Sequence, residues 1–179
     1  NGCILLTREQ ADALAKVVVV EKTGKDGKVT HMVNRDCVGR DCSVILEKIG
    51  LHVGPEIRCA IAEVPFEHTF VQTELMMPIL GIVRVKDIDQ AIDFAVKAEH
   101  GNRHTAHMHS KNIDNLSRFA TAIETTIFVK NAPSYAGIGF GGEGHTTFTI
   151  AGPTGEGITS ARSYTRLRRC VMADHFRII

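Results

Sequence analysis

Glu74 is the acidic residue whose surroundings suggest chemistry most strongly. It lies in the run Thr73-Glu74-Leu75-Met76-Met77-Pro78, directly before an apolar stretch. An ionised carboxylate offers two acceptor oxygens, so at such a junction it can bind the hydroxyl groups of a ligand. It can equally lie on a solvated surface turn, and composition alone favours this second interpretation. Both interpretations stay open on the residues themselves.

A glycine-rich motif occupies residues 137–142. Gly137-Ile138-Gly139-Phe140-Gly141-Gly142 matches GxGxxG, which in dinucleotide-binding folds opens a helix and precedes an acidic residue about 20 positions on. Here the β-branched run His145-Thr146-Thr147-Phe148-Thr149-Ile150 follows, and no acidic residue lies at the required distance beyond the motif. We therefore expect a flexible loop whose backbone approaches a neighbour closely, in preference to a phosphate-binding loop.

Four histidines lie close together in the sequence: His100, His104, His107 and His109. On a strand, His107 and His109 would share a face, and His104 would lie on the other. Apart from Glu99, no nearby cysteine or carboxylate completes a tetrahedral set of ligands. We therefore expect polar residues at the end of a strand, and no metal site.

The cysteines number five, an odd count, and form no CxxC pair. This pattern is typical of reduced thiols in the cytoplasm and unlike a disulfide framework. Cys3 has no basic residue fixed beside it that would activate a nucleophile. Cys59 lies in an apolar run, which indicates a small buried side chain. We expect neither thiol to be a catalytic nucleophile.

Residues 161–176 carry four arginines, which could bind phosphate or nucleic acid. The arginines alternate loosely with apolar residues, which suits a long exposed strand better, and charges along an edge strand discourage wrong pairing. The formal net charge of the chain is +1, so no global field attracts nucleic acid or an anionic membrane. The apolar run 17–20 is too short to span a bilayer, and no secretory signal precedes it. We expect no nucleic-acid partner and no membrane partner.

The stretch 80–130 must position any site, because it alternates between strand and helix patterns. Strands are predicted over 80–85, 104–109 and 125–130. A helix is predicted over 88–99, since its apolar residues recur at helical spacing, with Asp87 or Asp89 at its start and Gly101 at its end. A second helix begins after Asn112. Strands alternating with helices indicate a parallel sheet with right-handed crossovers.

The flanking segments supply shorter elements, and at 179 residues we expect one domain. A helix is predicted from Thr7, with Gln10 completing a capping box, to about residue 20. A polar turn over 24–27, an edge strand over 29–33, a helix from 41 or 43 to 49, and a strand over 58–64 follow. A connection covers 66–78, and a short strand is predicted over 145–150 within the glycine-rich region 131–157.

Several motifs in order resemble the C-terminal half of an aldehyde dehydrogenase. They are the Glu74 run extended to Leu80, His100-Gly101-Asn102-Arg103-His104-Thr105-Ala106, Ile127-Phe128-Val129-Lys130-Asn131, Gly152-Pro153-Thr154-Gly155-Glu156-Gly157 and Arg166-Leu167-Arg168-Arg169-Cys170-Val171. Together they resemble the CoA-acylating propionaldehyde and acetaldehyde dehydrogenases of propanediol and ethanolamine utilisation. The resemblance implies an α/β fold, namely a three-layer parallel-sheet catalytic domain. Residues 1–160 would belong to that domain, and 161–179 would form an oligomerisation strand.

The resemblance also implies roles for individual residues. Glu74 matches the acid that holds the nicotinamide ribose in a Glu-x-Phe-Gly-Pro motif, and Pro78 matches the proline. Met76 stands where phenylalanine is usual, so Glu74 and Met76 are the expected cofactor-binding residues. The run 139–142 resembles a Pro-Phe-Gly-Gly turn, so Phe140, Gly141 and Gly142 are expected to line the substrate end. Asn131 lies near an asparagine of the superfamily.

The implied activity is the oxidation of propanal or ethanal to its acyl-CoA through a cysteine thioester, with NAD and coenzyme A, or the reverse. The resemblance places the nucleophilic cysteine and the dinucleotide-binding domain before Asn1, because the run 2–7 resembles the helix beyond the nucleophile. We therefore expect no catalytic residue in this chain, which looks like a C-terminal piece of the enzyme. A homo-oligomer in the cytoplasm or in a bacterial microcompartment is expected. The alternative is an inactive piece that acts only as a scaffold or interaction module.

Overall fold

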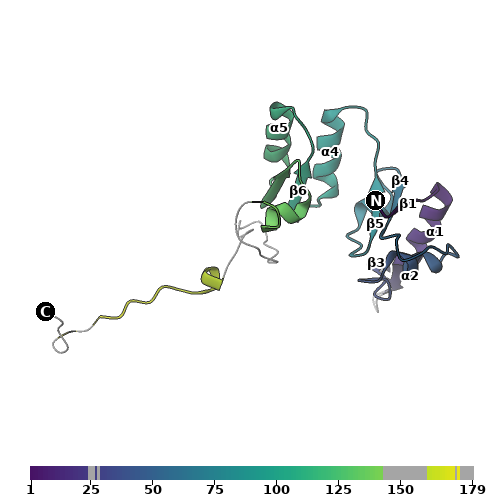
Figure 1. Cartoon of the computed structure of the whole chain (residues 1–179), viewed down its shortest axis with the longest axis horizontal. Helices are drawn as coiled ribbons and strands as arrows, with labels where there is room; N and C mark the ends of the chain where they lie inside the picture. The colour runs from purple at the N-terminus through teal and green to yellow at the C-terminus, as the bar shows by residue number, and fades with distance from the viewer. Residues whose placement is uncertain (24–26, 28, 143–160, 172, 174–179) are drawn as a thin grey trace. The chain divides into compact units, whose positions relative to one another are not determined.

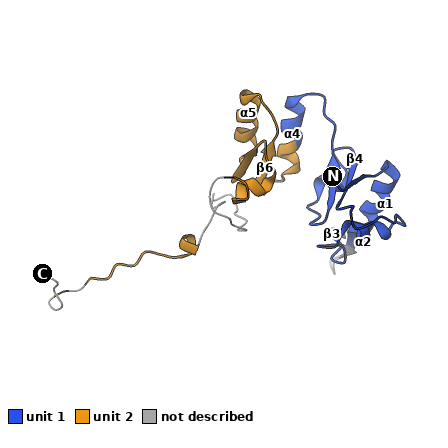
Figure 2. Ribbon diagram, viewed as in Figure 1, with its two compact units in different colours: residues 1–94 blue, residues 95–179 orange. Residues whose placement is uncertain are grey.

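The structure is a computed structural model that describes residues 1–23, 27, 29–142, 161–171 and 173. It consists of two compact units, Asn1–Phe94 and Ala95–Ile179, where the chain length predicts one domain. Figure 2 shows the two units in different colours. Because residues 143–160 lie outside the described part, the domain boundary expected at residue 160 stays a prediction.

Unit 1 is built on a parallel three-stranded sheet in the order β1-β4-β5. Its strands are β1 (Cys3–Leu5), β4 (Cys59–Glu63) and β5 (Ile79–Ile82) (Figure 1). The register aligns Leu5 with Ile61 and Ile61 with Leu80. The strands predicted over 58–64 and 80–85 are confirmed, although β5 is shorter and 83–85 lie beyond its end.

Two helices cover one face of this sheet with apolar side chains. Helix α1 (Arg8–Val18) has the predicted capping box, in which the Gln10 backbone N–H donates to the Thr7 side chain and the Gln10 side chain accepts from the Thr7 N–H. Helix α2 (Cys42–Glu47) follows Asp41, and Gly50 beyond it has a φ of 75°. The fully buried side chains Leu14, Ile45 and Leu46 each stabilise the fold by roughly 1.5–3 kcal/mol.

An antiparallel hairpin follows α1. It pairs β2 (Val19–Thr23) with β3 (Val29–Val33), and Val19 lies opposite Val33. The strand predicted over 29–33 is confirmed, whereas the sequence does not predict β2, because the apolar run 17–20 continues the helical pattern. Helix α1 ends at Val18, since the β-branched residues after it find a strand partner. The turn predicted over 24–27 lies mostly outside the described residues.

Three further expectations about unit 1 need correction. The resemblance implies a helix over residues 2–7, but Cys3–Leu5 forms β1, because β4 offers a parallel partner. Cys59 is only half-buried, while Ala60 and Ala62 on the opposite face are buried, since α1 and α2 cover that face. The connection over 66–78 contains a short helix, α3 (Thr69–Gln72), which no periodic pattern in so short a run could indicate.

Unit 2 contains a β-α-β element with a parallel pair of strands, β6 (Thr105–Met108) and β7 (Ile127–Lys130). Helix α5 (Ile113–Ile123) connects them, and the predicted cap is confirmed, since the Asn115 N–H donates to Asn112 Oδ1 at 3.0 Å. Its buried face includes Phe119, whose ring lies 5.5 Å from that of Phe128 on β7. A 3₁₀ helix, η1 (Ser134–Ile138), follows β7.

Helix α4 (Ile88–Ala98) contains the boundary between the two units. Its predicted ends are confirmed: Asp87 Oδ1 accepts from the Gln90 N–H at 2.8 Å, and Gly101 has a φ of 77°. The expected continuous ladder over 80–130 is not formed among the described residues, because β5 pairs with β4 and β6 pairs with β7. Parallel strands joined by a helix need not be neighbours in a sheet.

The C-terminal segment differs, over its described residues 161–171, from the strand predicted over 161–176. Residues Ala161–Tyr164 form the 3₁₀ helix η2, and 165–171 have no regular secondary structure. Every described residue from 161 to 171 is exposed, including Leu167 at 92%. A strand requires a partner that accepts its backbone hydrogen bonds, and sequence alternation alone supplies none. Within the described residues, no helix is long and apolar enough to cross a membrane.

Candidate functional site

The loop between α3 and β5 carries Glu74 and holds its backbone in a defined path. Leu75 is 5% exposed and anchors the loop in the core. The Met76 carbonyl accepts from the Gly39 N–H at 3.3 Å, and the Pro78 carbonyl accepts from the Ala60 N–H at 3.0 Å. The loop is therefore tied to β4 and to the segment before α2.

Glu74 itself is exposed, and it forms no hydrogen bond or ion pair with the described residues. Its neighbour Leu75 faces the core, so the carboxylate lies on the solvent side of an anchored loop. A carboxylate with both oxygens available can accept two hydrogen bonds from the vicinal hydroxyls of a sugar. This geometry is compatible with the ligand-binding interpretation, and it also fits a surface turn.

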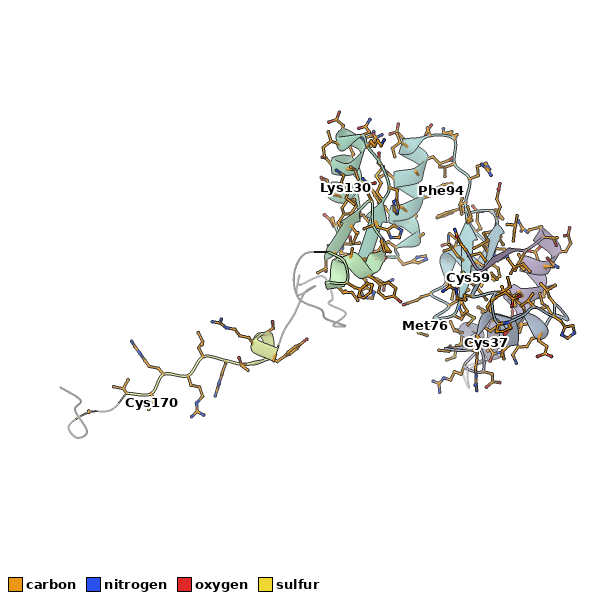
Figure 3. The ribbon with its side chains drawn as sticks, viewed as in Figure 1. Cys37, Cys59, Met76, Phe94, Lys130 and Cys170 are labelled. Atoms are coloured by element: carbon orange, nitrogen blue, oxygen red, sulfur yellow. The ribbon has the colours of Figure 1, made fainter. Side chains whose placement is uncertain are left out.

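Met76 has an uncommon backbone conformation, with a φ of 56°. A residue other than glycine in the left-handed region costs about 1–2 kcal/mol, and such strain is concentrated at functional sites. Met76 is 59% exposed, so burial does not compensate for this conformation. Figure 3 labels Met76 and draws its side chain. This backbone conformation leaves the thioether of Met76 in solvent, near Glu74 in the sequence, where it can contact the apolar face of a ring.

The glycine-rich turn of unit 2 is packed against β7. A Cβ at Gly137 would overlap Ile127 Cγ2 and lie 2.9 Å from Val129 Cγ2, and one at Gly142 would overlap the Ala136 carbonyl. This confirms the close backbone approach expected for the motif. Residues 145–150, where a short strand was expected, lie outside the described part.

Phe140 lies at the tip of this turn and is 75% exposed. Its backbone N–H donates to the Tyr135 carbonyl at 3.0 Å, and the two rings lie 6.5 Å apart. Gly139 and Gly141 on either side have φ values of 90° and 74°. Two left-handed glycines therefore present an aromatic ring to solvent, and this ring can contact an apolar substrate.

Asn131 joins the ends of β6 and β7. Its Oδ1 accepts from the Ser110 N–H at 2.7 Å, its Nδ2 donates to the Ser110 carbonyl at 2.9 Å, and its backbone N–H donates to the Met108 carbonyl at 3.0 Å. It adopts a left-handed φ of 53°, which asparagine tolerates better than most residues. All of its described polar contacts are internal, so its role here is to position the turn before η1.

The histidines predicted at a strand end lie on and around β6. His107 Nδ1 lies 3.3 Å from Ser134 Oγ, and the His107 and His109 rings lie 5.8 Å apart. Among the described residues, no group of three or more His, Cys, Asp or Glu side chains is placed to hold a metal ion. The absence of a metal site stays a prediction for the whole chain.

All five cysteines are free thiols. Burial raises the pKa of the Cys42 thiol and, together with neighbouring Cys3, that of Cys59. A raised pKa lowers the thiolate fraction at neutral pH, so both are poor nucleophiles. Cys3 is exposed on β1, opposite Cys59 in the sheet register.

His68 is a residue that sequence reasoning missed. It caps α3 through its Nδ1 and is 8% exposed. The available signal is the sequence His68-Thr69-Phe70-Val71-Gln72 between a proline and the Glu74 run, which is short and has no helical period. Glu74, Met76 and His68 belong to unit 1, and the turn of Phe140, Gly141 and Gly142 belongs to unit 2.

Each unit has an α/β architecture with parallel strands, and this architecture is also found in solved aldehyde dehydrogenases. Residues 11–169 match the aldehyde dehydrogenase family, and the chain belongs to this family. The predicted family and fold class are therefore confirmed.

Particular relatives are similar at high identity. The chain is 53% identical over 98% of its length to the acetylating acetaldehyde dehydrogenase EutE of Escherichia coli, and it spans 37% of that protein. It is 54% identical to a propionaldehyde dehydrogenase from the Clostridium phytofermentans fucose utilisation bacterial microcompartment, with a TM-score of 0.81 over 96% of this chain and 37% of that chain. It is 50% identical to the Rhodopseudomonas palustris propionaldehyde dehydrogenase with bound propionyl-CoA. The TM-score is 0.83, and the match covers 96% of this chain and 36% of that chain.

Proposed function

We propose that these residues belong to a CoA-acylating aldehyde dehydrogenase that converts propanal or ethanal to its acyl-CoA with NAD. The observation that carries the proposal is the 53% identity to an acetylating acetaldehyde dehydrogenase over almost the whole chain. The bound propionyl-CoA of the Rhodopseudomonas palustris relative supports coenzyme A as the acyl acceptor. The reaction consumes aldehyde, CoA and NAD⁺ and yields acyl-CoA, NADH and a proton.

In this proposal the anchored loop of unit 1 holds the cofactor. Glu74 accepts hydrogen bonds from the nicotinamide ribose, and Met76 offers an apolar surface beside the ring. The support is that the Glu74 carboxylate is exposed and has no described partner, so it can bind a ligand without breaking an internal contact. When bound, the nicotinamide supplies a hydride acceptor, and Glu74 contributes by orienting it.

The acyl carrier in the proposed reaction is a cysteine thiolate that adds to the aldehyde carbonyl. Loss of hydride from that carbon leaves a thioester, and the acyl group then passes to the thiol of coenzyme A. We propose that this cysteine is none of Cys3, Cys42 and Cys59, because Cys42 and Cys59 have raised pKa values and Cys3 lies on a strand without a described base. Phe140, Gly141 and Gly142 would line the substrate end.

The exposed C-terminal segment supports a role in self-association. Leu167 and Val171 are 92% and 76% exposed, and large apolar side chains at this exposure gain stability when a partner covers them. We propose that 161–179 pairs with another subunit of a homo-oligomer. The microcompartment source of one relative supports the same setting or the surrounding cytoplasm for this protein.

The test compares the 179-residue chain with the complete protein that carries it, using propanal or ethanal, CoA and NAD, and following NADH at 340 nm. The complete protein is expected to form NADH and acyl-CoA only when CoA is present, and NADP in place of NAD tests cofactor choice. The 179-residue chain alone is expected to form none. NADH formation by this chain that disappears in Cys3→Ala would make Cys3 the nucleophile.

A second candidate is an inactive module that acts only as a scaffold. The observation that favours it is the raised pKa of the Cys42 and Cys59 thiols, together with the 37% share of the relative's length that the chain spans. If the complete protein also forms no acyl-CoA while it remains folded, this second candidate replaces the first.

A further inference from the structure

His68 organises the helix that precedes Glu74. Its backbone N–H donates to the Pro65 carbonyl at 3.1 Å. Its carbonyl accepts from the Val71 and Gln72 N–H groups at 2.8 and 3.1 Å. Its Nδ1 accepts from the Phe70 N–H at 3.1 Å, which satisfies a donor at the start of α3. One residue therefore provides most of the described hydrogen bonds that hold this four-residue helix.

The imidazole also connects α3 with α1. Its side chain is 6% exposed. Nε2 lies 3.3 Å from Asp12 Oδ1, but the two groups are not aligned as a hydrogen bond. Asp12 is itself fixed by Arg8, whose Nε lies 2.9 and 3.1 Å from the two carboxylate oxygens. Because Nδ1 is an acceptor, the proton of the neutral ring is on Nε2 and faces Asp12.

The opposite side of α3 rests on β5. Phe70 is 7% exposed and belongs to the core. A Cβ added at Gly81 would lie 3.0 Å from Phe70 Cβ and 3.1 Å from Val71 Cγ2, so the helix approaches the strand backbone closely. The Thr73 N–H closes the helix on Thr69 at 3.1 Å, and Glu74 follows directly. The start of the Glu74 loop is therefore set by where α3 is held.

We propose that His68 is a positioning residue for Glu74. His68 holds α3 between α1 and β5, so that the Glu74 carboxylate meets the cofactor. This inference rests on the proposed cofactor role of Glu74. His68 touches neither substrate nor cofactor in this proposal and acts through α3. An isolated four-residue helix is unstable in water, so α3 depends on the hydrogen bonds of His68 and on the packing of Phe70.

The position of His68 also makes this arrangement sensitive to acid. Burial lowers the pKa of His68 below its usual 6.5, Arg8 lowers it further, and Asp12 opposes the change. Lys16 and Glu67 line the same surface pocket. Protonation puts a hydrogen on Nδ1, which can then no longer accept from Phe70. The stabilisation is therefore complete above pH 6.5 and is lost as the pH falls through the lowered pKa.

The experiment is a double-mutant cycle in the complete protein with His68→Ala, Glu74→Gln and both together. His68→Ala is expected to raise KM for NAD about three- to tenfold, with thiol labelling of the catalytic cysteine unchanged. The double variant is expected to be no worse than Glu74→Gln alone. His68→Asn is expected to recover most of the loss, because an asparagine oxygen also caps a helix.

Two further variants separate positioning from general destabilisation. Asn112→Ala removes the same kind of cap from α5, and it is expected to lower Tm without raising KM for NAD. As the pH falls and His68 is protonated, KM for NAD is expected to rise. Asp12→Asn keeps the shape of the side chain but removes a charge that raises the pKa of His68, so this rise is expected to move to lower pH. This variant also tests the inference if His68→Ala does not fold.

Each outcome decides between distinct conclusions. A KM for NAD that is unchanged in folded His68→Ala, or effects of His68→Ala and Glu74→Gln that add fully, overturns the positioning role while Glu74 keeps its assignment. Normal NAD kinetics in Glu74→Gln overturn the cofactor role of Glu74 and, with it, the positioning of that residue by His68. If His68→Ala cannot be measured, a pH dependence of KM for NAD that Asp12→Asn does not shift overturns the positioning role of His68.

Discussion

Replacing Glu74 by glutamine in the complete protein tests the central contact of the proposed site. The change keeps the size of the side chain and removes its charge. Because Glu74 is exposed and has no described partner, we expect the free energy of unfolding to change by no more than about 0.5 kcal/mol. The variant then stays folded, so a loss of activity would reflect a lost contact with a bound ligand.

The expected size of that loss follows from the proposed contact. A hydrogen bond between a carboxylate and a hydroxyl contributes roughly 1.5–3 kcal/mol, and each 1.4 kcal/mol corresponds to about a tenfold change. We therefore expect kcat/KM for NAD to fall about 10- to 100-fold. The matched control is Glu56→Gln, which neutralises another exposed carboxylate of unit 1 and should leave the kinetics unchanged.

The assay measures initial rates of NADH formation over a range of NAD concentrations at saturating aldehyde and CoA. Labelling of the catalytic cysteine with a thiol reagent should proceed at the wild-type rate, since Glu74 is not expected to contact it. Wild-type kcat and KM for NAD in Glu74→Gln would refute the reasoning and return Glu74 to a solvated surface turn. Equal losses in Glu56→Gln would show a general charge effect.

Three further predictions concern unit 2. Gly137→Ala is expected to lower the stability of unit 2 by about 1–3 kcal/mol, because the added Cβ overlaps Ile127. The Cβ of Gly141→Ala meets no atom, so this variant adds only the roughly 1–2 kcal/mol strain of its left-handed backbone. Thermal unfolding of the two variants distinguishes these effects. Asn131→Ala is expected to cost about 1–3 kcal/mol, since two hydrogen bonds to Ser110 are lost, and a Tm equal to wild type contradicts this. Deleting 161–179 is expected to convert an oligomer to monomers by light scattering, and an unchanged assembly mass rules out that segment as the contact.

Local signals in the sequence determined most helices and their ends. The Thr7 and Gln10 pair, Asn112 before α5 and Gly101 after α4 all act as predicted, because capping depends on a few neighbouring residues. Motifs in a fixed order also identified the family, since they combine several loops with their spacing. The candidate residues Glu74 and Met76 were found through the same motifs.

The tertiary structure alone decided which strands pair and which faces are covered. Alternation cannot show that β5 takes β4 as its partner, because pairing depends on segments distant in sequence. It also cannot show that Ala60 and Ala62 are buried while Cys59 is half-exposed, since α1 and α2 select the covered face. The tail shows the same limit, because an alternating segment forms a strand only where another chain segment accepts its hydrogen bonds.

The support behind Glu74 was decided in the same way. His68 lies 56 positions after Asp12 in the sequence, yet the two side chains are 3.3 Å apart, because the tertiary structure brings the start of α3 next to α1. Met76 has a left-handed backbone that its side chain does not favour, and Gly39 and β4 hold the loop around it. Residue types therefore indicated which carboxylate to consider, while the packing of distant elements determined where it is held.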